Sequence, residues 1–126
     1  MKSRDAVLRL KRFEADEKAR KVSDLQHMIA EFERMAGDLE RQIRAEEERT
    51  GVKDVQHYAY STFAKSASQR RDNLLSSANG LRSKLEIAER ERDEAFEQLS
   101  RVSAGEGQTA LREIRRPERH SGMVVR

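Results

Sequence analysis

Cysteine and tryptophan are absent from this 126-residue chain, and proline occurs only once. The lack of cysteine excludes a disulfide scaffold and a thiolate metal site. Hydrophobic residues make up 36% and aromatic residues 5%, which is too little for the closed core of a globular domain of this length. No apolar run approaches the roughly 18 residues of a membrane span. The opening MKSRDAVLRLKRF has charges in place of the apolar segment of a secretory signal, so we expect a soluble, cytoplasmic protein.

Motifs for catalysis and for nucleotide binding are also missing. The chain contains neither the phosphate loop GxxxxGK[ST] nor the dinucleotide fingerprint GxGxxG. The three histidines, His27, His57 and His120, are far apart, and the spacing of Asp54 and His57 is more typical of a turn contact than of half a metal site. We therefore expect a protein with no enzymatic activity, no cofactor and no bound metal.

Charge is what the chain has in abundance, at 39% of its residues, and its sign changes along the sequence. Residues 1–21 hold eight Lys or Arg and four Asp or Glu, whereas residues 22–50 hold four and eight. The basic start could meet an acidic surface on a partner, or it could be an ordinary solvated helix face. We expect no binding to nucleic acid, because the basic residues are neither interleaved with aromatics nor placed on a groove-entering helix.

Hydrophobic residues of the first half follow a heptad repeat. From Val22 to Ile43 the intervals alternate between three and four without a miss, which is the 3.5-residue period of a coiled-coil seam. Lys11 and Lys18 are polar residues in the same frame. The apolar members of this seam are Leu8, Ala15, Val22, Leu25, Ile29, Phe32, Ala36, Leu39 and Ile43.

The second half has a heptad frame of its own after a break at Thr50 and Gly51, where Gly51 suits a left-handed helix cap. The sequence predicts a helix over about 3–49, a turn over about 50–60, and a helix over about 61–104. Gly105, Gly107 and Pro117 predict that residues 105–126 form a flexible basic tail. The frame of the second helix contains Tyr60, Ala64, Ala67, Arg71, Leu74, Ala78, Leu81, Leu85, Ala88, Arg92, Ala95, Leu99 and Val102.

Two heptad helices joined by a short break pack most simply against each other in antiparallel directions. The predicted fold class is therefore all-α, an antiparallel two-helix coiled-coil hairpin with a mobile C-terminal tail. We expect Arg71 to lie opposite Ala36 and Arg92 opposite Ala15, with each arginine head reaching water. Other expected facing pairs are Ile43 with Ala64, Leu39 with Ala67, Phe32 with Leu74, Ile29 with Ala78, Leu25 with Leu81, Val22 with Leu85, and Leu8 with Leu99.

Two groups of residues are candidates for binding a partner. Tyr58, Tyr60 and Phe63 cluster at the turn, where they could close the end of the coil by local packing or dock a partner. The second group is basic and lies near the N-terminus. Lysines at two seam positions there would weaken the helix pair and favour an outside partner, or would set the register. The members of the basic group are Arg9, Lys11, Arg12, Lys18 and Lys21.

Three segments of the chain, within about residues 3–85, resemble the FliJ-type flagellar export proteins of bacteria. They are SRDAVLRLKRFEADEKARKV, FERMAGDLERQIRAEEERTGV and HYAYSTFAKSASQRRDNLLSSANGL. The most specific pieces are RLKRF at 9–13, TGV at 50–52 and QRRDNLL at 69–75. The family's second helix extends well beyond its first, and the glycines after Ala104 predict an earlier end here.

The resemblance implies a role in the flagellar type III export apparatus, at the cytoplasmic face of the inner membrane. Members of the family resemble the central stalk of rotary ATPases. They insert the open end of the hairpin into the export ATPase ring, contact the export gate, and bind export chaperones. By this likeness, Arg9, Lys11, Arg12, Lys18 and Lys21 would contact the ATPase ring, and Tyr58, Tyr60 and Phe63 the gate. The alternatives are a homodimeric coiled-coil scaffold or spacer, and a basic helical protein that associates with nucleic acid.

Overall fold

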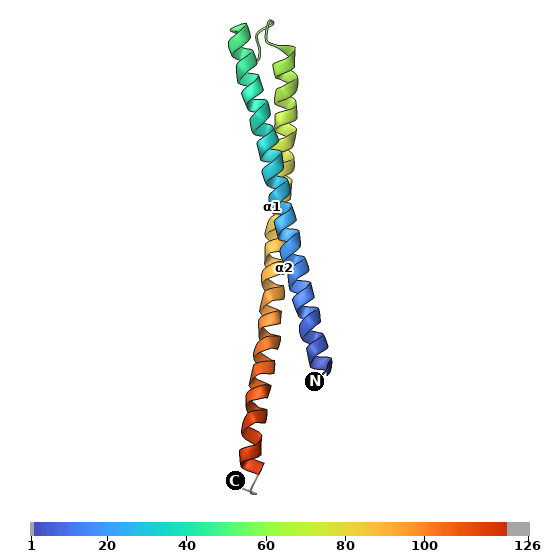
Figure 1. The fold of residues 1–126 in the computed structure, drawn as a ribbon. Coiled ribbons are helices and arrows are strands. Elements are labelled where there is room, and N and C mark those ends of the chain that lie inside the picture. The colour runs from blue at the N-terminus through green and yellow to red at the C-terminus, as the bar shows by residue number, and fades with distance from the viewer. Residues whose placement is uncertain (1, 121–126) are drawn as a thin grey trace. The chain divides into compact units, whose positions relative to one another are not determined.

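The structure, a computed structural model, describes residues 2–120, with side chains over residues 3–105. It consists of helix α1 (Lys2–Thr50) and helix α2 (Thr62–His120), joined by a loop over residues 51–61 (Figure 1). The chain divides into two compact units. One contains residues 21–88, including the loop, and the other contains residues 1–20 together with the chain from Glu89 onward.

Both helices follow from residues that favour helical backbone and that support one another along it. Charged residues of opposite sign recur three or four positions apart, as in Glu31 and Arg34 or Glu97 and Arg101. Such pairs are neighbours on a helix surface, and each adds a few tenths of a kcal/mol. The first helix ends at Thr50 because Gly51 takes a left-handed backbone conformation with φ of 75°.

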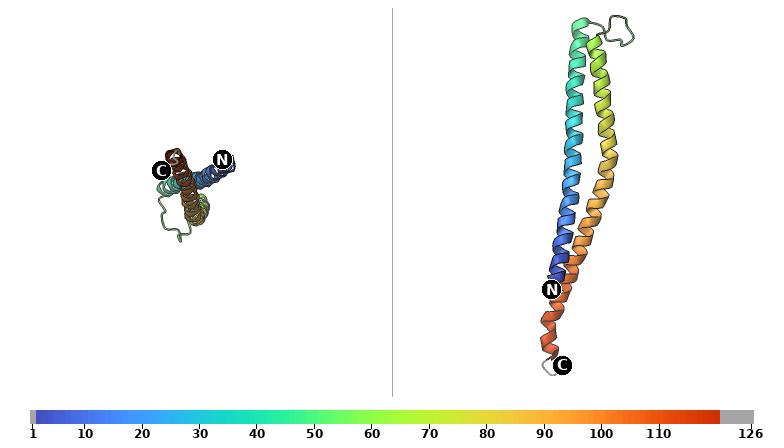
Figure 2. Two further views of the ribbon diagram at one scale, coloured as in Figure 1. Left: turned by 90° about the horizontal axis from the view of Figure 1, so that it is seen from below. Right: turned by 90° about the vertical axis from the view of Figure 1, so that its right-hand side faces the viewer.

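Within residues 21–88, the two helices run antiparallel and pack along the predicted seams (Figure 2). Ile43, Ala64 and Ala67 form one buried cluster, against which Leu39 and Tyr60 pack. A second cluster lies nearer the other end of this unit and consists of Val22, Leu25 and Ala88, with Leu81 and Leu85 packed against it.

In the unit formed by residues 1–20 and the chain from Glu89 onward, the seam is more polar. Ala15 is fully buried, with 0% of its surface exposed, and Leu8 and Leu99 are half-buried. Lys18 Nζ lies 3.4 Å from Glu91 Oε1, and Lys11 Nζ donates a hydrogen bond of 3.2 Å to Gln98 Oε1. The two seam lysines therefore hold side chains of α2.

The structure confirms the all-α antiparallel hairpin. Every buried hydrophobic residue among those described belongs to one of the two heptad frames, and no seam residue of those frames is exposed. The buried residues are Ala15, Val22, Leu25, Ile29, Ala36, Ile43, Ala64, Ala67, Ala78 and Ala88. The remaining predicted apolar and aromatic seam residues are half-buried, namely Leu8, Phe32, Leu39, Tyr60, Leu74, Leu81, Leu85, Ala95, Leu99 and Val102.

The predicted end of the second helix near Ala104 is wrong. Helix α2 continues to His120, so residues 105–120 are helical where a flexible tail was expected. A glycine inside a helix costs only about 1 kcal/mol relative to alanine, so Gly105 weakens the helix without ending it. The rest of the expected tail, residues 121–126, lies outside the described residues. Neither helix, over its described residues, is apolar enough along a sufficient length to cross a membrane.

Two glycines should respond in opposite ways to substitution by alanine. Nothing lies within 4 Å of a Cβ added at either Gly51 or Gly80, so crowding plays no part. Gly51→Ala should lower the free energy of unfolding by about 1–2 kcal/mol, because it forces an L-residue into left-handed backbone. Gly80→Ala, inside α2, should raise it by about 0.5–1 kcal/mol. Urea denaturation followed by circular dichroism measures both, and a stabilised Gly51→Ala variant would contradict the assigned loop conformation.

Candidate functional site

The loop that joins the helices is built from short-range hydrogen bonds. Gly51 N donates to Glu47 O at 2.9 Å, and Val52 N donates to the Thr50 hydroxyl at 3.2 Å. Threonine and glycine thus supply the side-chain acceptor and the backbone freedom that this exit from α1 needs. In the right-hand view of Figure 2 the loop bulges to one side of the helix ends.

The outermost part of the loop is a pair of turns centred on Asp54 and His57. Asp54 accepts from Gln56 N through its carboxylate at 2.9 Å and from His57 N through its carbonyl at 3.0 Å. His57 in turn accepts from Ala59 N through Nδ1 and from Tyr60 N through its carbonyl, both at 3.0 Å. The contact predicted for Asp54 and His57 is therefore a backbone turn. The rings of His57 and Tyr58 stack with their centroids 4.6 Å apart.

Two carboxylates near the end of α1 fasten the returning chain. Tyr60 donates its phenolic hydrogen to Glu47 Oε2 at 2.6 Å, and this bond raises the pKa of Tyr60 above its ordinary value. Ser61 donates its hydroxyl to Glu46 Oε2 at 2.7 Å and accepts from Ala64 N at 3.1 Å. Ser61 is thus the N-cap of α2, and it is also bonded to α1.

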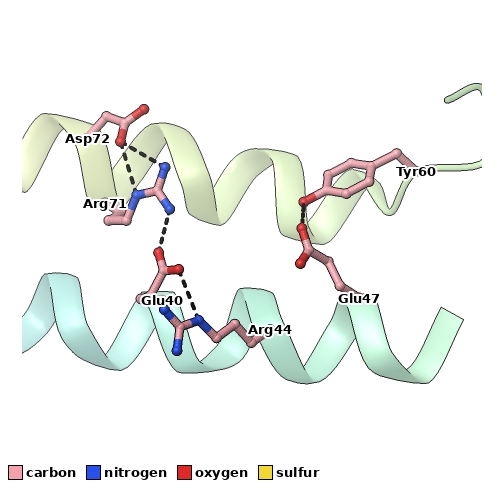
Figure 3. A network of polar contacts seen from close by, with 6 residues as sticks. All are labelled: Glu40, Arg44, Glu47, Tyr60, Arg71 and Asp72. Carbon is pink, nitrogen blue, oxygen red and sulfur yellow. Dashed lines mark hydrogen bonds and ion pairs between the residues drawn. The ribbon is translucent and has the colours of Figure 1, made fainter. Parts of the chain in front are cut away.

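A second polar network lies further along the same unit (Figure 3). Arg71, a seam residue of α2, donates to Glu40 of α1 and also to Asp72. Glu40 additionally accepts from Arg44 Nε at 3.3 Å. The hydrogen bond from Arg71 is the main reason that the pKa of Glu40 lies below its ordinary value. The head of Arg71 is held by carboxylates of both helices, whereas the sequence predicted only that it would reach water.

The three aromatic residues predicted as a docking group have different environments. Tyr60 is half-buried against the cluster of Ile43, Ala64 and Ala67, which is the local-packing alternative. Tyr58 is 95% exposed and Phe63 is 54% exposed, so both remain available to a partner. Val55, which is 50% exposed in the same loop, was not among the predicted residues. An apolar residue inside a predicted turn is the sequence feature that could have identified Val55.

The five basic residues predicted to contact a partner also separate into two kinds. Lys11 and Lys18 are half-buried and engaged across the seam with Gln98 and Glu91. Arg9, Arg12 and Lys21 are exposed and make no ion pair with any residue whose side chain is described. The heptad period distinguishes the engaged residues from the exposed ones, because Lys11 and Lys18 are the two that fall at seam positions.

Exposed apolar residues beside Arg9 and Arg12 were missed as candidates. Leu10 is 53% exposed and Phe13 is 60% exposed, and Val7 on the same helix is 44% exposed. All three fall outside the heptad a and d positions. An apolar residue off the seam is the sequence signal that could have identified them.

Nowhere in the described part of the chain do three or more His, Asp or Glu side chains gather in a way that could hold a metal ion. Among the described side chains, large exposed apolar residues lie around the loop (Val55, Tyr58 and Phe63) and near the start of α1 (Val7, Leu10 and Phe13). Comparison of the chain with protein-family models, with curated proteins and with solved structures finds no match.

The capping role of Ser61 predicts a specific loss of stability. Ser61→Ala removes the acceptor for Ala64 N and the donor to Glu46, and it should lower the free energy of unfolding by about 1 kcal/mol. Ser66→Ala, at an exposed position inside α2, is the matched control and should be neutral or slightly stabilising. Equal melting temperatures for the two variants would show that the cap does not stabilise α2.

Acid should weaken the attachment of the loop through Glu46. Hydrogen bonds from Arg49 and then Ser61 lower the pKa of Glu46 from 4.5 to about 2. Since the folded chain binds this proton less readily than the unfolded chain, the contribution is complete above about pH 4.5 and is lost as the pH falls toward 2.

A pH series of melting temperatures tests this contribution. Glu46→Gln should melt at a lower temperature than the unmodified chain at neutral pH, and should lose less stability on acidification. The effect should be modest because Arg49 is exposed to solvent. Glu48→Gln is the control, since Glu48 forms no hydrogen bond or ion pair with the described side chains. Parallel pH curves for Glu46→Gln and the unmodified chain would contradict the assigned role.

Proposed function

We propose that the chain is a non-enzymatic, stalk-like component of the bacterial flagellar type III export apparatus. In this role it links the export ATPase ring to the export gate at the cytoplasmic face of the inner membrane, and it binds export chaperones. The observation that carries the proposal is the antiparallel hairpin itself, formed by a chain whose segments RLKRF, TGV and QRRDNLL resemble the FliJ-type export proteins.

The two exposed surfaces consist of different residues in different units of the chain, which supports a linking role. Val55 and Tyr58 of the loop and Phe63 at the start of α2 belong to the unit of residues 21–88, whereas Val7, Leu10 and Phe13 belong to the other unit. Two different partners can therefore be bound without competing for the same residues.

The two surfaces suit the two partners in different ways. On α1, Arg9, Arg12 and Lys21 form no ion pair with a described side chain, and they favour an acidic partner, which we assign to the ATPase ring. The exposed Tyr58 of the hydrogen-bonded loop and the exposed Phe63 at the start of α2 are typical anchors of a protein interface, and we assign this surface to the gate. Tyr60 fastens the returning chain to α1 through its hydrogen bond to Glu47.

Deletion and complementation in the flagellated host test the function. A strain without the gene should export little flagellin and swim poorly, and the unmodified gene should restore both. The double variant Tyr58→Ser with Phe63→Ser should restore them only partly, because it removes the proposed gate anchors. Flagellin in the culture supernatant and swimming diameter in soft agar are the measurements.

The double variant Leu75→Ser with Ile87→Ser is the matched control, because these residues are 41% and 49% exposed but lie on the helices away from the loop. It should complement fully. Normal swimming in the deletion strain would refute the export role. A stable dimer in light scattering that persists on dilution would favour the alternative, a homodimeric scaffold or spacer.

A further inference from the structure

The loop between the helices uses the same hydrogen-bonding pattern twice in succession. Asp54 accepts from Gln56 N through its carboxylate at 2.9 Å and from His57 N through its carbonyl at 3.0 Å. His57 accepts in the same pattern, from Ala59 N through Nδ1 and from Tyr60 N through its carbonyl, both at 3.0 Å. In the second turn an imidazole nitrogen therefore takes the place that a carboxylate oxygen has in the first.

The two side-chain acceptors respond differently to protons near neutral pH. An imidazole nitrogen accepts a hydrogen bond only through a free lone pair, so the bond from Ala59 N requires that Nδ1 of His57 carry no hydrogen. The neutral ring then carries its hydrogen on Nε2. Protonation turns both ring nitrogens into donors and removes the acceptor. Histidine changes charge between about pH 5 and 8, whereas a carboxylate of ordinary acidity stays ionised over that range.

The imidazole ring of His57 also contacts the exposed tyrosine of the loop. The rings of His57 and Tyr58 stack with their centroids 4.6 Å apart and their planes 24° apart. The bond from Ala59 N fixes the imidazole in the orientation in which this stack forms. Tyr58 is 95% exposed, so it has little other contact with the protein. A change at Nδ1 of His57 therefore reaches Tyr58 directly.

Ionisable side chains lie on every segment around His57, but the contacts of its ring are the stack on Tyr58 and the bond from Ala59 N. The glutamates at the end of α1 bind the chain where it returns to α2, and the carboxylate of the loop binds a backbone amide. Proton uptake by the ring is therefore coupled first to the turn itself. The ionisable residues of these segments include Glu46, Glu47, Lys53, Asp54, Tyr58 and Lys65.

We propose that His57 is a pH-sensitive switch of the loop that carries Tyr58. With the ring neutral, Nδ1 holds Ala59 N and the turn is fixed. With the ring protonated that bond is lost, and the turn keeps its backbone bond from Tyr60 N but becomes more mobile. Because only the unprotonated ring can accept, the fixed state belongs to neutral and higher pH and is lost as the pH falls toward about 5.

The release should be confined to this turn. Ser61 holds the returning chain to Glu46, whose pKa is lowered to about 2, so this attachment persists throughout the range in which histidine titrates. The exit from α1 depends on the Thr50 hydroxyl and on Gly51, which do not titrate there. Mild acid should therefore loosen the backbone around Tyr58 without separating the helices.

NMR of the isotopically labelled full-length chain tests the switch. Between about pH 7.5 and 5.5, protection of the Ala59 amide against hydrogen exchange, corrected for the intrinsic pH dependence, should fall by about fivefold. This is the change expected for the loss of one hydrogen bond with a net worth of about 1 kcal/mol. The heteronuclear NOE of the Tyr58 amide should fall over the same range. Ring nitrogen shifts should place the hydrogen of neutral His57 on Nε2.

Two substitutions at position 57 separate the switch from a fixed structural contact. His57→Asn keeps an acceptor for the amide two residues later but does not titrate, so protection and NOE should stay high at both pH values. His57→Ala removes the acceptor and should leave both low at both pH values. His27→Asn, at an exposed position of α1, is the matched control and should leave the pH dependence of Tyr58 and Ala59 unchanged.

Three outcomes would overturn the proposal. The first is equal order of the Tyr58 and Ala59 amides at both pH values while the His57 ring titrates. The second is a pH dependence that persists in His57→Asn, since another group would then cause it. The third is a neutral ring with its hydrogen on Nδ1. The switch concerns the loop alone and does not rest on the proposed function: its failure leaves the export role standing, and normal swimming of the deletion strain leaves the switch standing.

Discussion

The packing of small α2 side chains against larger α1 side chains is the interaction on which the rest of the structure depends. Ala64, Ala67, Ala78 and Ala88 are all buried. Ala64 lies in a cluster with Ile43, and Ala88 lies in a cluster with Val22 and Leu25. Alanine lets two helices approach closely, so a chain with little apolar surface can still bury a continuous stripe. The register set by this stripe brings Glu46 and Glu47 to the returning chain and so determines the form of the loop.

Polar contacts across the helix pair add specificity to this nonspecific burial. Apolar seams tolerate a shift of one heptad with little loss, but a shift would separate Arg71 from Glu40 and Lys18 from Glu91. These groups are partly exposed, so each pair adds little to stability by itself. Their effect is to disfavour other registers, and within the described side chains no buried polar atom lacks a hydrogen-bond partner.

The sequence predicted those features of the fold that depend on period. Heptad spacing identified every buried residue, and the antiparallel register brought Ile43 to Ala64 and Val22 to Leu85 as expected. The surroundings of individual loop residues and the position where α2 ends were not predictable. The heptad frame includes Tyr60, which packs against the cluster of Ile43, Ala64 and Ala67, but the period does not show that Tyr58 faces solvent, because its surroundings depend on the path of the loop. The continuation of α2 beyond Gly105 was not predictable for another reason, since the modest helix penalty of glycine does not by itself decide whether a helix ends.

The hydrogen-bonded turns between Asp54 and Ser61 have a kinetic consequence for whatever meets the loop. Association normally costs free energy for immobilising flexible backbone and side chains. Here the backbone around Tyr58 is already fixed by bonds from Gln56, His57 and Ala59. A partner would therefore meet a preorganised surface, so encounters should not have to wait for a folding step. Most of the entropy still to be lost would be that of the exposed rings and of the partner itself.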